Sequence, residues 1–197
     1  FRRVLFRSRR EVTVRREVDE LVRAFVARVR ERRSGVFVVE GAAGAGKSAT
    51  LAELVRAARA EGASVRATRA TRADAGRPFG CLLDVLDYRQ RHDDPAARRV
   101  VAALAGVAPA AGTRDDTWHL RVQEAIVDLL RGGAPGPVPV LAVDDAHLAD
   151  AGTLGVLRTL ARATAGEPAI VVWTERSGRN DPALAELRAR ILDVQHR

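Results

Sequence analysis

One short segment, Gly41-Ala42-Ala43-Gly44-Ala45-Gly46-Lys47-Ser48, constrains this chain more than any other. It fits the pattern G-x-x-x-x-G-K-[ST]. The preceding run Val36–Val39 is β-branched and aromatic, which is typical of a buried strand. Residues 47–60 then repeat apolar side chains at helical spacing. The order of strand, glycine-rich loop and helix predicts an α/β fold with a loop that wraps a phosphate group.

The residue types of this loop suit the binding of a phosphate chain. Glycines allow backbone angles that turn successive N–H groups toward an anion, and the helix N-terminus adds its positive end. Lys47, the only lysine among 33 basic residues, can reach two phosphates, and the Ser48 hydroxyl can bind Mg²⁺. The alternative is a glycine-rich turn with an incidental lysine. We predict phosphate contacts from Gly41, Ala42, Ala43, Gly44, Ala45, Gly46, Lys47, Ser48 and Ala49.

A pair of carboxylates, Asp144-Asp145, follows a second buried run at 138–143. The carboxyl end of a parallel strand faces the crevice in which α/β proteins bind ligands. Mg²⁺ takes one or two carboxylates together with phosphate oxygens and water. We expect Asp144 on the metal side with Ser48, while Asp145 and Lys47 serve catalysis, Asp145 by orienting or deprotonating the attacking water. The alternative is a solvated pair that caps a turn.

Five further residues have weaker signals. His147 is interpreted as a packing histidine or a contact of the last phosphate, and Asp150 as the N-cap of the following helix. Thr174 and Arg176 end a strand, either as sensors of that phosphate or as part of an exposed loop. Cys81 stands among leucines and is interpreted as a buried thiol.

Apolar periodicity predicts strands and helices in alternation. This pattern is typical of a three-layer α/β/α domain around a parallel sheet. We predict strands at 36–39, 64–71, 138–143 and 169–174, and helices at 17–32, 47–60, 81–88, 95–104, 117–131, 151–164 and 182–192.

Charge divides the chain into two parts. The net charge is +8, of which residues 1–33 carry +7 (twelve arginines against five acids) and the remainder +1. We expect residues 1–11 to be a basic end without ordered structure, and residues 12–197 to form one domain. A basic arm that touches nucleic acid is the alternative for the first segment.

Composition excludes several other classes of protein. No stretch of 18 uncharged apolar residues is present, so we expect no membrane partner. One cysteine rules out an internal disulfide and a multi-cysteine metal site. A cytoplasmic location is then the default. The 47% of apolar residues suffice for a packed core.

Several motifs together resemble a known family. These are Val38-Val39-Glu40-Gly41 with the glycine loop, Leu141-Ala142-Val143-Asp144-Asp145-Ala146-His147-Leu148-Ala149-Asp150, Pro78-Phe79-Gly80, and Arg16-Glu17-Val18-Asp19-Glu20-Leu21. They resemble the nucleotide-binding module of large LuxR-type transcriptional regulators, which are signal-transduction (STAND) ATPases of the AAA-like P-loop class. Arg15 and Leu148 stand where that family has glycine and often tryptophan.

The resemblance implies a slow ATPase that works as a switch, with ATP or ADP and Mg²⁺ as cofactors. ADP would hold a closed form, and ATP an open form that associates with itself. The sheet order would be 5-1-4-3-2. A helical lid and a DNA-binding helix-turn-helix would follow Arg197, so DNA would be bound only through a domain outside this chain.

The chain has no Met and begins with Phe1, so we expect it to be a piece of a longer protein. The fifth strand would then be missing, and the strand at 36–39 would be an uncovered sheet edge.

Two other functions agree with the same motifs. The first is an AAA-type ATPase of another setting, such as a DNA loader, a transposition ATPase or a cyclase-associated signalling ATPase. The second is a scaffold that binds nucleotide without hydrolysing it.

Overall fold

A five-stranded sheet forms the centre of the molecule, in the order β1-β2-β5-β4-β3. The computed structural model describes residues 3–4, 14–91, 93–105, 116–132, 136–162, 168–177 and 184–185. β2, β5, β4 and β3 are mutually parallel, which confirms the predicted α/β class and the order of four strands. The strands are β1 Arg3–Val4, β2 Gly35–Gly41, β3 Ser64–Arg69, β4 Pro139–Asp144 and β5 Ile170–Arg176.

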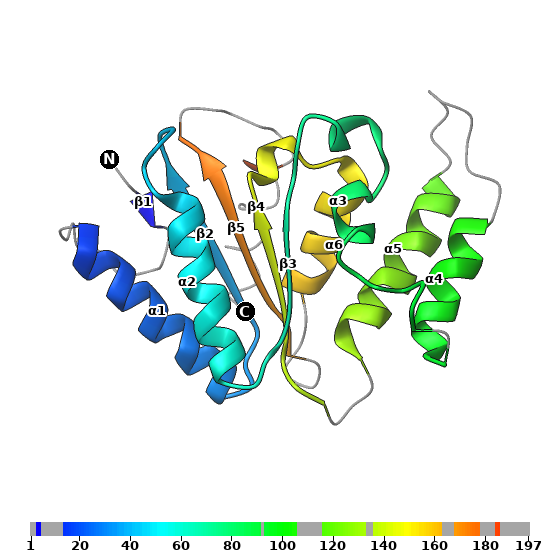
Figure 1. The fold of residues 1–197 in the computed structure, drawn as a ribbon, viewed down its shortest axis with the longest axis horizontal. Helices are drawn as coiled ribbons and strands as arrows, with labels where there is room; N and C mark the ends of the chain where they lie inside the picture. Colours follow the sequence, from blue (N-terminus) through cyan, green and yellow to red (C-terminus); the bar gives the residue numbers. More distant parts are fainter. Residues whose placement is uncertain are drawn as a thin grey trace.

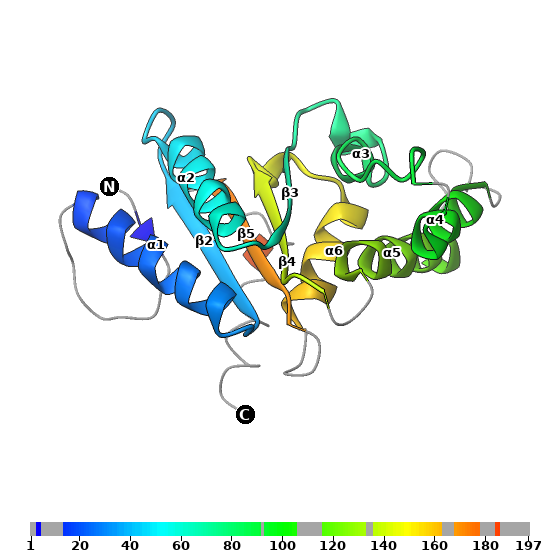
Figure 2. The same ribbon diagram turned by 60° about the horizontal axis from the view of Figure 1, so that its bottom comes forward.

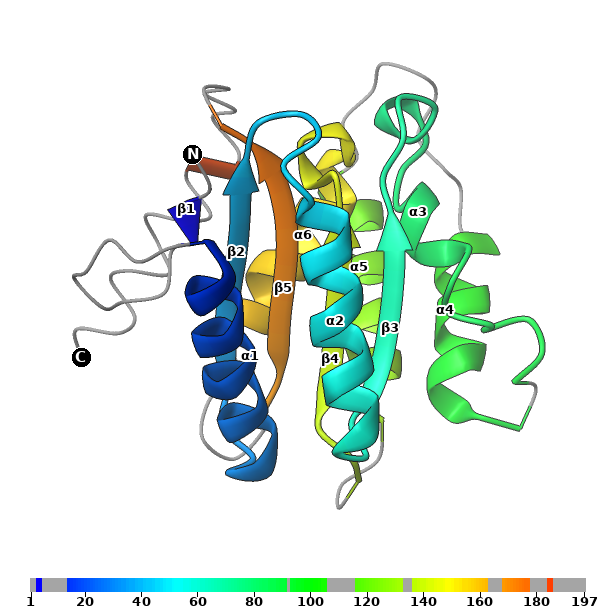
Figure 3. The same cartoon turned by 60° about the vertical axis from the view of Figure 1, so that its left-hand side comes forward.

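Helices cover both faces of the sheet (Figures 1 and 3). α1 and α2 lie on one face, while α6 and α5 lie on the other, with α4 packed outside α5. Their bounds are α1 Val14–Arg30, α2 Lys47–Ala60, α3 Gly80–Leu83, α4 Pro95–Ala105, α5 Asp116–Arg131 and α6 Ala151–Ala161, with the 3₁₀ turns η1 Asp74–Gly76 and η2 Ala146–Leu148. Within the described ranges, no helix has the length and apolar character needed to span a bilayer.

Each face of the sheet has its own apolar core. Alternate residues of a strand point to opposite faces, so Phe37 and Val39 pack against α1 and α2, while Val38 packs toward α5 and α6. β4 is buried along its whole length, as expected for a strand covered on both sides. The rings of Phe25 and Phe37 meet edge to face at 5.0 Å between centroids and join α1 to β2.

Most predicted elements are present, but several boundaries are wrong. The helix expected at 17–32 ends at Arg30, because Arg32 adopts a left-handed φ of 50°. The helix expected at 81–88 is only Gly80–Leu83. The strand expected at 64–71 ends at Arg69, since the Thr71 N–H donates to the side chain of Asp74 at 2.8 Å and leaves the ladder.

The last predicted helix, 182–192, lies outside the described residues except for 184–185, which are helical. The helix predicted at 151–164 ends earlier, at Ala161 with Arg162 as its C-cap, and residues 163–164 lie outside the described residues.

The outer edge of β2 differs from the prediction. Arg3 and Val4, within the segment expected to lack order, form β1 and pair antiparallel with Glu40 and Val39. The prediction of an uncovered edge is therefore wrong at the carboxyl end of β2, because backbone N–H and C=O groups there gain partners from the same chain. The other residues of 1–11 lie outside the described residues. Figure 2 shows β1 and β2 side by side.

Candidate active site

The glycine loop joins the carboxyl end of β2 to the start of α2 (Figure 1). Gly44 and Gly46 both have φ of 75°, in the left-handed region where side chains are strained. Gly46 is the N-cap of α2 and makes no side-chain cap, so the first N–H groups of the helix are not capped by their own N-cap residue. The loop residues Ala42, Ala43, Gly44 and Gly46 are exposed. The geometry therefore presents backbone N–H groups and a helix N-terminus at the surface.

Lys47 is held beneath this loop. Lys47 is only 7% exposed, and its Nζ donates a hydrogen bond to the carbonyl of Ala42 at 2.9 Å. One turn further, Thr50 donates to the carbonyl of Gly46 through both its N–H, at 3.0 Å, and its hydroxyl, at 3.2 Å. The ammonium group thus lies within the loop that sequence analysis assigned to phosphates.

Asp144, at the end of β4, is the most enclosed carboxylate of the site. Its residue is 7% exposed. The Thr174 hydroxyl donates to Oδ1 at 2.6 Å, and Nε and Nη2 of Arg69 donate to Oδ2 at 2.9 and 2.7 Å. These donors come from β5 and β3, the two neighbours of β4 in the sheet. The parallel register brings the three side chains together.

The surroundings of Asp144 favour its charged form. Burial alone would raise the pKa of this carboxyl group. Hydrogen bonds from Thr174, Ser48 and Arg69, together with the positive charge of Arg69, outweigh burial and hold the pKa below its usual value. Asp144 is therefore an anion over the ordinary range of pH.

Asp145 lies beside Asp144 in an unusual backbone conformation. Its φ is 53°, in the left-handed region, which Asp tolerates better than most residues. Its N–H donates to Thr174 Oγ1 at 2.8 Å and to Asp144 Oδ1 at 3.2 Å. Two side chains thus fix the backbone conformation that orients the Asp145 side chain. The carboxylate of Asp145 is half-exposed. Strain of this kind is often found at functional sites.

Arg69, which sequence analysis did not single out, connects the loop to the carboxylates. Its Nη2 donates to Ser48 Oγ at 3.0 Å as well as to Asp144, and its Nε lies 3.7 Å from Asp145 Oδ2. One of 32 arginines attracts no notice by its type. The sequence signal for Arg69 was its position at the end of a predicted strand, next to the strand that carries Asp144.

Comparison of the sequence with known protein families agrees with this architecture. Residues 11–172 match the family described as AAA ATPase domain. The chain belongs to this AAA ATPase family. Its fold is accordingly the nucleotide-binding P-loop fold, and the glycine loop stands between strand and helix as that fold requires.

A solved structure shares a partial likeness with this AAA ATPase domain. "Structure of the Aeropyrum Pernix ORC2 protein (ADPNP-ADP complexes)" is 18% identical in sequence, with a TM-score of 0.47. The match covers 94% of this chain and 46% of that one, so the chain spans about half the length of the ORC2 chain. No curated protein matches the sequence.

The oxygen atoms of the AAA site fit a divalent cation whose remaining ligands are phosphate oxygens and water. Ser48 Oγ and Asp144 Oδ2 both contact one nitrogen, Arg69 Nη2, so a hydroxyl and a carboxylate converge on one cationic position. Among the residues that the structure describes, no cluster of three or more His, Cys, Asp or Glu could hold a metal ion. One hydroxyl and one carboxylate oxygen are donors of the kind that Mg²⁺ takes together with phosphate oxygens and water.

The remaining predicted residues are placed as follows. Asp150 is the N-cap of α6, as predicted, and accepts from the N–H groups of Gly152 and Thr153. His147 lies half-buried in η2. Cys81 is a buried thiol, as predicted, and burial raises its pKa to about 11. Arg176 ends β5 as an exposed residue, opposite Gly41 in the register of β2 and β5.

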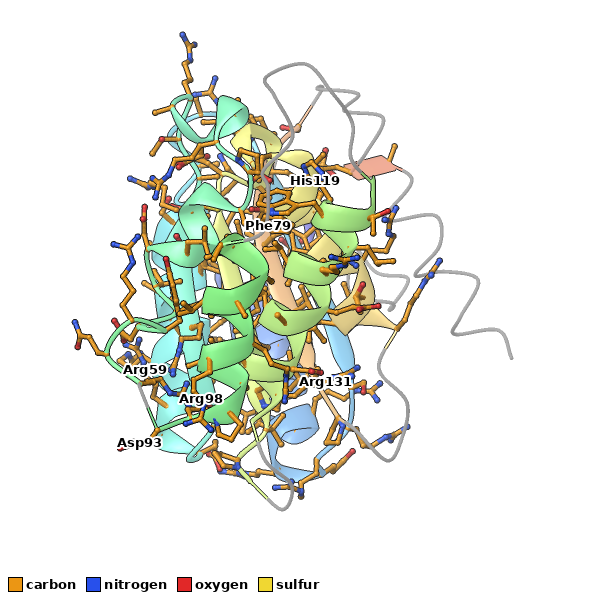
Figure 4. The ribbon with its side chains drawn as sticks, turned by 90° about the vertical axis from the view of Figure 1, so that its right-hand side faces the viewer. Arg59, Phe79, Asp93, Arg98, His119 and Arg131 are labelled. Atoms are coloured by element: carbon orange, nitrogen blue, oxygen red, sulfur yellow. The ribbon has the colours of Figure 1, made fainter. Side chains whose placement is uncertain are left out.

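Asp150 also joins two distant segments of the domain. Its Oδ1 accepts the N–H of Phe79 at 2.9 Å, which holds Phe79 at a left-handed φ of 57°. The Phe79 ring is fully buried and lies near Trp118 and His119 of α5. Figure 4 shows Phe79 close to His119. A Cβ at Gly152 would come within 2.7 Å of this ring, so α6 needs glycine there. These contacts fix the loop after β3 on α6.

Proposed function

We propose that this chain is an ATP-binding and ATP-hydrolysing switch module. One observation carries the proposal: Ser48, in the first turn of α2, and Asp144, at the end of β4, are both hydrogen-bonded to Arg69 Nη2 at the carboxyl ends of the parallel strands. Lys47 and Asp145 are their neighbours in the chain. These strand ends are the edge at which α/β sheets bind ligands. A glycine-rich loop and a pair of carboxylates lie there, which supports the proposal because a P-loop ATPase needs a phosphate cradle and acidic groups.

The phosphate chain would be bound by the loop Gly41–Ala49. Its backbone N–H groups and the N-terminus of α2 attract negative charge. Lys47 would exchange the carbonyl of Ala42, now 2.9 Å from its Nζ, for oxygens of the β- and γ-phosphates. Ser48 and Asp144 would hold Mg²⁺, which supplies charge neutralisation at the transferred phosphate.

Asp145 would act on the attacking water. Its backbone is fixed by Thr174 and Asp144, while its carboxylate is the more exposed of the pair. It would orient the water and accept its proton as the bond to the γ-phosphate forms and ADP leaves. Thr174 contacts the backbone of Asp145, and Arg176, two residues further along β5, would sense the γ-phosphate.

The setting we propose is a larger LuxR-type transcriptional regulator in the cytoplasm. The resemblance of the motifs supports it, and two of those motifs, Pro78-Phe79-Gly80 and the run that ends in Asp150, are joined by the Phe79–Asp150 hydrogen bond. In this setting ATP promotes self-association, hydrolysis resets the module, and DNA is bound by another domain.

The test is a pair of measurements on the purified chain. ATP binding is followed by calorimetry, and release of phosphate by a single-turnover assay, with Asp145→Asn as the matched control. Binding without turnover in the wild type would favour the scaffold alternative and contradict hydrolysis. Light scattering with ATP and with ADP tests self-association, which we expect only with ATP.

A further inference from the structure

Arg69 lies where the cation of the site would be needed. Its guanidinium contacts Asp144 Oδ2 at 2.7 Å and Ser48 Oγ at 3.0 Å, and lies 3.7 Å from Asp145 Oδ2. The structure thus places a positive charge from β3 on the same two oxygens that a P-loop ATPase uses for Mg²⁺. The guanidinium and a divalent cation cannot both occupy that position.

The charges of the site show what Arg69 contributes. Asp144 and Asp145 are negative, and Lys47 alone would leave these three side chains with a net charge of −1. Arg69 brings the four to zero. A phosphate chain that approached without Arg69 or a metal ion would meet two carboxylates and one ammonium, and like charges at close range repel.

The side chain of Arg69 is also able to leave. It is 59% exposed, whereas that of Asp144 is 10% exposed. Thr174 continues to hold the other oxygen of Asp144 when Arg69 moves, since its hydroxyl donates to Oδ1. The carboxylate can therefore keep its position while its cation is exchanged.

We propose that Arg69 is an internal counter-cation that occupies the metal position at Ser48 and Asp144, lets the site accept ATP or ADP without Mg²⁺, and moves away when the Mg²⁺ complex of the nucleotide binds. This role rests on the proposed function and adds a residue that determines how strongly nucleotide binding depends on the metal. Arg69 and Mg²⁺ compete, so each weakens the binding of the other.

The experiment measures ATP affinity by calorimetry in excess MgCl₂ and in EDTA. In the wild type, affinity with Mg²⁺ exceeds affinity in EDTA by a small ratio. Arg69→Gln raises that ratio by about tenfold, mainly by weakening binding in EDTA. Arg69→Lys, which keeps the charge, stays near the wild-type ratio. In the absence of nucleotide, electron paramagnetic resonance shows Mn²⁺ binding that increases in Arg69→Gln.

Arg77→Gln is the matched control. Arg77 pairs with Asp84 at 2.6 Å and its side chain is 55% exposed, so it resembles Arg69 in exposure and partner but does not contact Ser48 or Asp144. An Arg69→Gln ratio equal to that of the wild type, or an equal rise in Arg77→Gln, overturns the proposed role. If Lys47→Ala loses ATP binding while Arg69→Gln leaves the ratio unchanged, only this inference fails. A wild type that binds ATP in neither solution overturns the proposed function as well.

Discussion

The glycine loop and the carboxylate cluster face each other across the site, and they hold their polar groups by different means. The loop is local: Gly44 and Gly46 set the backbone, and Lys47 is bonded to Ala42 five residues before it. The cluster is assembled from three strands, and two side chains that donate to Asp144, those of Arg69 and Thr174, come from positions 75 and 30 residues away in the chain.

This difference explains how each part responds to change. In the loop, most side chains are small and exposed, and we propose that its backbone N–H groups supply the binding. In the cluster, a buried carboxylate must keep its donors, because an unpaired buried charge is costly. Substitutions in the loop should therefore affect binding, while substitutions in the cluster should affect both chemistry and stability.

The largest effect is expected for Lys47→Ala. It removes the one lysine of the chain and with it the two charge-assisted contacts to phosphates that we propose, so ATP affinity should fall by about a hundredfold or more. Calorimetry with ATP measures this loss. Arg56→Ala, on the same helix but 79% exposed, is the control and should bind as the wild type does. Unchanged affinity in a folded Lys47→Ala protein would contradict the assignment of the loop.

The two carboxylates should separate binding from turnover. Asp145→Asn should keep ATP binding and lower single-turnover hydrolysis by about a hundredfold or more, since it removes the general base that we propose. Asp144→Asn should lose the Mg²⁺-dependent part of ATP binding. If both variants lose both functions equally, the division of roles between the neighbours is wrong.

Asp150→Ala should act on stability alone. It deprives four donors of their acceptor: the N–H groups of Phe79, Gly152 and Thr153 and the Thr153 hydroxyl. The expected loss is about 3 kcal/mol in the free energy of unfolding, from a helix cap and a buried contact together. Urea unfolding measures it. Asp128→Ala, an exposed acid paired with Arg99, is the control, and an equal effect there would refute the special place of Asp150.

The smallest effect is expected for Thr174→Val, and it should depend on pH. The folded pKa of Asp144 is depressed, so its stabilising contribution is full above the pKa of the unfolded chain and is lost as the pH falls through the folded pKa. Removing the Thr174 hydroxyl should lower stability by about 1 kcal/mol at neutral pH. The loss should be smaller in strong acid, where only the hydrogen bond from the Asp145 N–H to Thr174 Oγ1 is still removed by the substitution.

Unfolding in urea at neutral and acid pH tests this dependence. Thr68→Val is the matched control, because its hydroxyl donates to the uncharged carbonyl of Cys81 at 2.8 Å. Its effect should be the same at both pH values, and a pH-independent effect of Thr174→Val would contradict the linkage to Asp144.

The sequence by itself determined the elements whose signals are local. Val36–Val39, the glycine loop and the helix at 47–60 follow one another along the chain. The conformation of each can be predicted from the shapes of its own side chains and from the backbone freedom of its glycines. The alternation of strands and helices predicted the parallel sheet. Asp144 was predicted as a site residue because it stands at the carboxyl end of one of these predicted strands. Asp150 was predicted as an N-cap because a cap acts within three residues.

Only the tertiary structure decided the contacts between distant segments. That Arg69 meets Asp144 and Ser48 depends on β3 lying beside β4 and on the register of that pair. That Arg3 and Val4 cover the end of β2 depends on backbone groups, which carry no sequence signal. The hydrogen bond from the Phe79 N–H to Asp150 likewise could not be predicted from the sequence, because it joins two distant segments of the chain. Periodicity reports which face of an element is apolar, whereas the pairing of polar groups is set by strand order and register.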